Sequence, residues 1–188
     1  MADSFYPLDK ISTRRGEWVI KVMVIRIWSG AFKGNKNDDQ PLEMLVHDSK
    51  GTRIHCSIPK HVVRSFRAIL SEGQMFTISS FLVNKNNLWM RNNSHEFRIT
   101  LLQRSRVVHI MPPSFAFQPF CFRSISSILY AEKLDQNILF DVLAEVIGRE
   151  DPIDMVTKQG NESKRLALLV EVSEKTTISS PCLEDWWT

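Results

Sequence analysis

Basic and aromatic side chains recur together in the first 110 residues of this 188-residue chain. Residues 1–110 carry seventeen Lys and Arg against nine Asp and Glu, whereas residues 111–188 carry seven against twelve. A positive surface that also presents flat rings can neutralise phosphates and stack on bases. These residue types therefore predict that residues 1–110 bind a nucleic acid.

Nine residues are candidates for that surface, because most of them fall in expected loops or near strand ends. They are Trp28, Lys33, Lys36, Arg53, His55, Phe66, Lys85, Trp89 and Arg91. The cations would meet phosphates, and each base stacked on an aromatic ring would contribute ~1–3 kcal/mol. Because a duplex hides its base faces, stacking of this kind favours a single strand.

Each aromatic candidate also has a structural alternative. Trp18 lies inside an apolar strand and Phe66 follows the apolar period of a helix, so packing in the core is favoured for both. Trp28 is balanced between the two roles. For Trp89 the base-stacking role is favoured over a cap on the end of the fold. A single loop lysine is usually only solubilising, so the charge of the whole segment is the stronger signal.

The sequence contains no motif typical of an enzyme or a metal site. Cys56, Cys121 and Cys182 are far apart, and the five histidines are scattered. No phosphate-binding glycine loop or nucleophile motif is present. We therefore expect no catalysis, no metal and no cofactor. No apolar run approaches the ~20 residues that span a bilayer, and the start lacks a secretory signal, so no membrane partner is expected.

Alternating apolar residues predict five strands and one short helix in residues 1–110. Strands are expected over 18–28, 42–47, 52–58 and 74–83, and a last one, after a turn at 84–87, over 88–91 and 97–101. The helix is expected over 60–70, between the third and fourth strands. This order predicts an all-β protein with a short helix, built as the five-stranded Greek-key barrel called the OB-fold. An OB-fold binds oligonucleotides on strands two and three, flanked by two loops, where most of the candidates lie.

A proline-rich break divides the chain after this barrel. Met111-Pro112-Pro113 interrupts the pattern, and strands are expected again over 140–147 and 165–172, around a polar loop at 148–164. Too few residues follow to complete another barrel. We therefore expect an OB-fold nucleic-acid-binding domain over 1–110, a linker over 111–138, and a truncated second OB-like unit over 139–188.

Several stretches of the sequence resemble plant replication protein A large-subunit-like proteins, whose large subunit is the 70 kDa DNA-binding subunit. They are Trp18–Trp28, Leu42–Gly51, Ile58-Pro59 and Gly73–Ile78, which resemble the first OB domain of that family. Residues 139–172 look like the opening strands of the family's next OB domain.

The resemblance implies single-stranded DNA binding, without catalysis, in nuclear DNA replication, recombination and repair. It also implies other replication protein A subunits as candidate partners, and RNA stays open as an alternative ligand. The family places a stacking aromatic residue where this chain has Leu42 and a basic residue near Met23, whereas Phe66 matches a second aromatic position. The alternative is therefore an OB-fold protein-interaction module with weak or no nucleic-acid binding.

Overall fold

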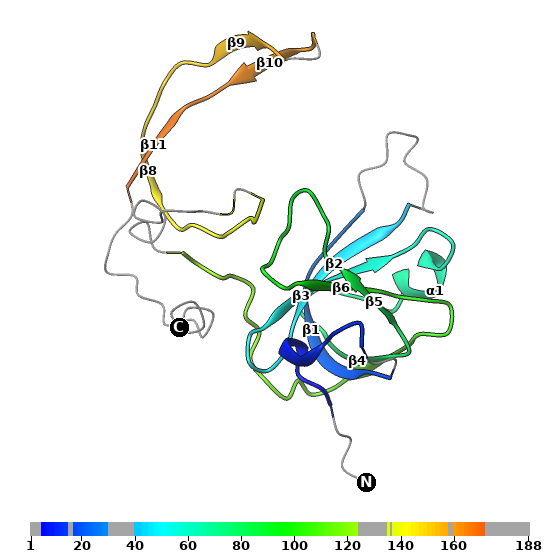
Figure 1. Ribbon diagram of the computed structural model, residues 1–188. Coiled ribbons are helices and arrows are strands. Elements are labelled where there is room, and N and C mark those ends of the chain that lie inside the picture. Colours follow the sequence, from blue (N-terminus) through cyan, green and yellow to red (C-terminus); the bar gives the residue numbers. More distant parts are fainter. Residues whose placement is uncertain are drawn as a thin grey trace. The chain divides into compact units, whose positions relative to one another are not determined.

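The computed structural model describes residues 5–14, 17–29, 40–123, 135, 137–157 and 160–171, which form two compact units (Figure 1). The first unit holds the described residues up to Cys121 together with Asp135–Phe140, and the second holds Phe122, Arg123 and residues 141–171. The domain limits expected from the sequence, 1–110, 111–138 and 139–188, stay predictions.

A seven-stranded sheet makes up most of the first unit, after a short 3-10 turn η1 (Leu8–Lys10). Its strands pair in the order β5-β6-β3-β2-β1-β4-β7. Their bounds are β1 (Val19–Ser29), β2 (Leu42–His47), β3 (Arg53–Ile58), β4 (Met75–Ser79), β5 (Leu82–Lys85), β6 (Phe97–Thr100) and β7 (Arg106–Ile110). All pairs are antiparallel except β3 with β6.

The connection between β4 and β5 shows that this sheet is strongly curved. Only Ser80 and Phe81 separate the two strands, so Ser79 and Leu82 lie at most about 11 Å apart. In a flat sheet of this order β4 and β5 would lie roughly 24 Å apart, since neighbouring strands are about 4.8 Å apart. Ser80, whose φ of 58° lies in the left-handed region, makes the corner between them.

A continuous apolar core fills the curved sheet. Ile20, Val22 and Val24 alternate along β1 and are fully buried. The short helix α1 (Val63–Arg67) adds Val63 and Phe66 to the core. Each such side chain contributes about 1.5–3 kcal/mol by its burial. The prediction of a mostly β fold with one short helix is confirmed, whereas the closed five-stranded barrel stays a finer prediction.

The structure corrects the predicted hairpin after residue 83. Asn84 and Lys85 belong to β5, where they pair with β6, and residues 86–96 form a loop without a strand. The predicted turn at 84–87 and strand at 88–91 are therefore wrong. The asparagines suggested a turn, but Asn84 Nδ2 donates to Thr100 Oγ1 across the strand pair at 3.1 Å. Strand β7 over Arg106–Ile110 was not predicted from the sequence.

The strands that the structure describes in the second unit form one long β-hairpin. Strand β8 (Glu145–Arg149) pairs with β11 (Leu168–Glu171), and β9 (Ile153–Val156) pairs with β10 (Glu162–Arg165). The hairpin reverses around Gly160, whose φ is 81°. The predicted loop over 148–164 is wrong, because β9 lies inside it. The truncated OB-like character of this unit stays a prediction.

Candidate nucleic-acid interface

Three strands place Trp28, Glu43 and Ser57 side by side on one face of the sheet. Trp28 on β1 pairs with Glu43 on β2, and Glu43 pairs with Ser57 on β3. Directly opposed residues share a face, with Cβ atoms about 4.5–5.5 Å apart. Their backbone neighbours Leu42 and Met44 are buried in the core, so Glu43 lies on the outer face.

Glu43 is the polar centre of this face. Its Oε2 accepts hydrogen bonds from His55 Nε2 at 2.7 Å and from Ser57 Oγ at 2.6 Å. Burial alone would raise the pKa of Glu43, but these hydrogen bonds and the charges of His55 and Arg98 outweigh burial and hold it below its usual value. Glu43 is therefore ionised at neutral pH and acts only as a hydrogen-bond acceptor.

Trp28 and His55 lie in edge-to-face contact, with ring centroids 5.5 Å apart. The contact with His55 anchors the Trp28 ring. Because Trp28 is 37% exposed, its ring still offers surface to a ligand. His55 is only 4% exposed, and its Nδ1 lies 3.3 Å from Asn92 Oδ1. His55 was predicted as a contact for nucleic acid, and the structure places it as a support beneath that face.

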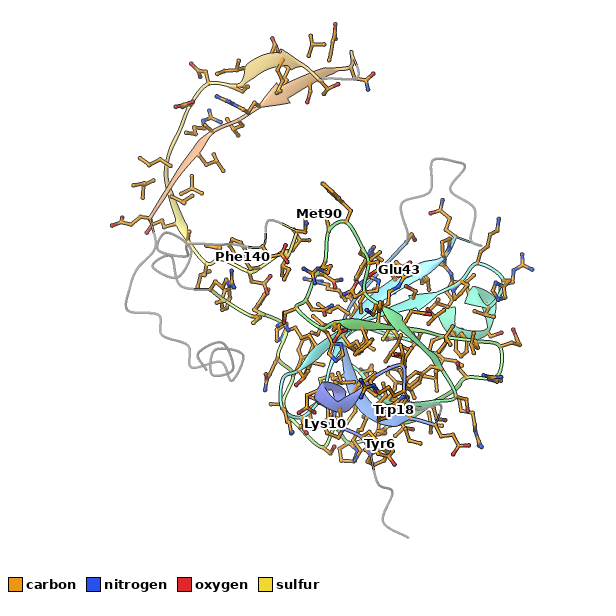
Figure 2. The ribbon with its side chains drawn as sticks, in the orientation of Figure 1. Tyr6, Lys10, Trp18, Glu43, Met90 and Phe140 are labelled. Atoms are coloured by element: carbon orange, nitrogen blue, oxygen red, sulfur yellow. The ribbon has the colours of Figure 1, made fainter. Side chains whose placement is uncertain are left out.

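The loop over residues 86–96 carries the most exposed aromatic ring near this face. Trp89 is 81% exposed, and Met90 lies at the outer end of the loop (Figure 2). The loop is tied to β3 through Asn92 and His55. Lys85, which is exposed, lies at the end of β5 where the loop begins. Trp89 and Lys85 therefore have accessible side chains where the sequence predicted contacts.

Arg91 is held by a later segment of the chain. Its guanidinium forms an ion pair with Asp135, its backbone N–H donates to Asn137 O, and its carbonyl accepts from Leu139 N. Ile138 pairs with Arg91 as an isolated parallel bridge. Since ion pairs at the surface contribute only about 0–1 kcal/mol, Arg91 can exchange Asp135 for a phosphate at small cost.

Arg53 also meets a later segment. Its Nη2 donates to Gln118 O at 3.2 Å, and Gln118 N donates to His47 Nε2 at 3.2 Å. The rings of Phe115 and Phe117 lie 5.5 and 6.2 Å from that of His47. Residues 115–118, which belong to the first unit, therefore pack beside the β2–β3 turn. Burial lowers the pKa of His47, with a further lowering from Arg53, so its ring is neutral at pH 7.

The remaining sequence candidates divide into two cases. Phe66 is 4% exposed and packs in the core, which agrees with its structural alternative and leaves it no face for a base. Lys33 and Lys36 lie outside the described residues. Glu43 and Asp135 were not among the residues that the sequence predicted for this face. An acidic residue within an apolar strand was the available signal for Glu43, whereas nothing in the sequence pointed to Asp135.

The described residues offer no group of three His, Cys, Asp or Glu side chains that could hold a metal ion. Burial, and then the charge of Glu43, raises the pKa of the Cys56 thiol, so this cysteine is unreactive at neutral pH. None of the helices in the described ranges is long and apolar enough to cross a membrane.

The fold is similar to that of solved OB-fold proteins. A replication protein A heterotrimer bound to single-stranded DNA contains a chain with a TM-score of 0.54 and 18% identity. The match covers 88% of this chain but only 38% of that chain. DNA-binding domain A of S. cerevisiae replication protein A gives a TM-score of 0.44 at 17% identity, covering 58% of this chain and 96% of that one. A hypothetical protein from Arabidopsis thaliana gives 0.44 at 12%, covering 63% and 81%.

At 18% identity, the similarity to the chain of the replication protein A heterotrimer shows a shared fold alone. No curated protein matches the sequence. A family profile described as "domain of unknown function DUF223" matches residues 9–130, which include nearly all of the first unit and the whole face around Glu43. On this match over more than half of its length, the chain belongs to the DUF223 family.

Proposed function

We propose that this chain binds single-stranded DNA as an OB-fold protein of the replication protein A large-subunit type, without catalysing a reaction. The observation that carries the proposal is Trp89, whose indole is 81% exposed on the 86–96 loop beside β3. An indole so exposed contributes little to folding, whereas a flat ring on a loop that is tied to β3 suits stacking of an unpaired base.

The proposed contacts come from the sequence candidates that the structure leaves accessible or displaceable. Trp28 and Trp89 would stack on bases, and Lys85 would meet phosphates. Arg53 and Arg91 would do so after exchanging their present partners. Lys33 and Lys36, from the segment between β1 and β2, complete the proposed set. His55 and Phe66 are given no direct contact, because both are buried.

The biological setting of the proposal rests on analogy with the replication protein A chain, which was solved with single-stranded DNA. By that analogy the chain acts in the nucleus, in DNA replication, recombination and repair, and other replication protein A subunits are candidate partners. RNA remains an alternative ligand. This chain spans about two fifths of the replication protein A chain, so functions of that whole protein need tests of their own.

Fluorescence anisotropy of a labelled thymine-rich single strand, titrated with the full chain at two salt concentrations, tests the proposal. We expect binding to weaken with salt, because a single strand releases counterions with a slope of about −0.7 per phosphate. A duplex should compete poorly, because its base faces are not available for stacking. Trp89→Ala should weaken binding by roughly 5-fold to 150-fold, from a stacking energy of ~1–3 kcal/mol. Ile69→Ala removes another exposed apolar side chain, just after α1, and should leave the affinity unchanged.

Absence of binding at low salt would refute the proposal and favour the second candidate, a protein-interaction module. The observation that favours this candidate is the hairpin of the second unit, where both strands of the β8–β11 pair expose apolar residues. Among them are Val146, Ile147, Leu168 and Leu169, each more than half exposed. An isolated two-stranded hairpin is marginally stable in water, and exposed apolar surface often marks a protein contact. An apolar contact would show little dependence on salt.

A further inference from the structure

Glu43 gives the proposed binding face a feature that phosphate binding does not explain. A carboxylate repels phosphates, yet Glu43 lies between Trp28 and Ser57 at the middle of the face. Its side chain is 23% exposed, so a ligand can reach it. An acceptor at this place suits the hydrogen-bond donors on the edge of a base.

The hydrogen bonds of Glu43 leave one of its oxygens available. Oε2 accepts from His55 and Ser57, whereas Oε1 accepts no hydrogen bond from the residues that the structure describes. The two donors also fix the side chain, because both bonds are short. Oε1 is therefore a preorganised acceptor that loses little conformational entropy when a ligand binds.

Trp28 determines which part of a nucleotide would meet this acceptor. Trp28 and Glu43 are directly opposed across β1 and β2. Their Cβ atoms are therefore about 5 Å apart. A base stacked on the exposed indole would thus bring its hydrogen-bonding edge close to Oε1, with its sugar and phosphate further away. In single strands that edge is free of a pairing partner.

The four bases differ in the donors they bring to a carboxylate. Guanine offers two adjacent donors, N1–H and N2–H₂, on its pairing edge. Adenine and cytosine each offer one amino group beside an acceptor nitrogen. Thymine offers one N–H between two carbonyl oxygens, which a carboxylate repels. The ionised acceptor beside Trp28 therefore matches guanine best and thymine least.

We propose that Trp28 and Glu43 form a base-reading subsite that prefers guanine, with Glu43 Oε1 accepting hydrogen bonds from N1–H and N2–H₂. The inference rests on the proposed function and adds a base preference to it. His55 and Ser57 are positioning residues, because their short hydrogen bonds to Oε2 hold the Glu43 side chain in place. The remaining contacts, through rings and cations, do not distinguish between bases.

The test compares thymine-rich single strands that carry one central guanine, hypoxanthine, cytosine, adenine or thymine, bound to the full chain and followed by anisotropy. Hypoxanthine keeps N1–H and lacks the N2 amino group. We expect guanine to bind ~5-fold or more tightly than thymine, with hypoxanthine between them, from the energy of a paired base contact. In Glu43→Gln, His55 and Ser57 should donate to the amide oxygen, so that the NH₂ group turns toward the base. The preference for guanine should then disappear or pass to bases that offer acceptors.

Glu96→Gln is the matched control, because it removes one negative charge from the exposed side of the 86–96 loop. Glu96→Gln should strengthen the binding of all five DNA strands alike, and the preference for guanine should remain. Equal affinity of the unaltered chain for all five strands would overturn the inference and leave single-strand binding intact. No binding to any strand would overturn both. If Glu43→Gln does not fold, as judged by circular dichroism, the series on the unaltered chain still decides.

Discussion

Replacing Asp135 with Asn should strengthen the binding of single-stranded DNA. In the structure the Asp135 carboxylate forms an ion pair with the guanidinium of Arg91. Arg91 is one of the proposed phosphate contacts, so the carboxylate competes with phosphate. Asparagine keeps the size of the side chain, and its oxygen can still accept the hydrogen bond that Asn137 N donates to Asp135 Oδ1 at 3.0 Å. The backbone bonds from Arg91 to Asn137 and Leu139 also stay in place. The substitution therefore removes the competing charge and little else.

The size of the effect follows from the strength of the ion pair. The Asp135 and Arg91 side chains are 45% and 23% exposed, so solvent screens them and the pair contributes about 0.2–1 kcal/mol. Any ligand that binds Arg91 must first break this ion pair. Asp135→Asn should therefore make the free energy of DNA binding more favourable by the same amount. That is a gain of up to ~5-fold in affinity. The gain should shrink as salt is added.

Anisotropy titrations of the unaltered chain and Asp135→Asn at two salt concentrations measure this gain. Asp154→Asn is the matched control, because Asp154 forms an exposed ion pair with Lys164 in the hairpin of the second unit. It removes the same charge without involving Arg91. Equal gains in both variants would show a general charge effect. Unchanged or weaker binding in Asp135→Asn would refute the reasoning that Asp135 competes with DNA for Arg91.

Two further predictions concern stability. Because the pKa of His47 is lowered by burial, the unfolded chain binds a proton more readily, so stability is complete above about pH 6.5 and falls below it. Thermal unfolding between pH 7.5 and 5 should show this fall in stability. His47→Gln should make the fall smaller, whereas His61→Gln, at an exposed position, should leave it unchanged. Equal pH dependence of stability in the two variants would contradict the prediction. Phe66→Ala should destabilise the fold by ~3–5 kcal/mol in urea unfolding. The folded fraction should keep its affinity for DNA, and a selective loss of affinity would instead make Phe66 a base contact.

The sequence predicted the elements whose side chains alternate clearly and missed those that depend on distant partners. The β-branched run from Val19 to Ile27 fits a strand by its own pattern. The 84–87 stretch was misread, because its asparagines indicate a turn locally, whereas in the fold Asn84 bonds to Thr100 and Asn86 to His95. Local composition cannot reveal such bonds.

The candidate site shows the same division. The base-stacking role favoured for Trp89 stays a prediction; its indole is exposed, and it lies in a loop where the sequence predicted a hairpin strand. The partners of Arg53 and Arg91 lie 65 and 44 residues away along the chain, and no pattern in either segment indicates the contact. Glu43 could have been noticed as the acidic residue of an apolar strand. Its hydrogen bonds to His55 and Ser57 require the register of β2 with β3.

The parallel pairing of β3 with β6 has a consequence for how the protein is made. It joins His55–Ser57 to Arg98–Thr100, and β6 also pairs with β5 on its other side. Ile99 on β6 and Leu101, which directly follows this strand, are both fully buried in the core. During synthesis β3 therefore lacks its partner β6 until residues 97–101 have left the ribosome, and the apolar core lacks the side chains that these residues supply. Contacts so distant in sequence also slow folding. A nascent chain of this protein would thus depend on chaperones for longer than a helical protein of equal length.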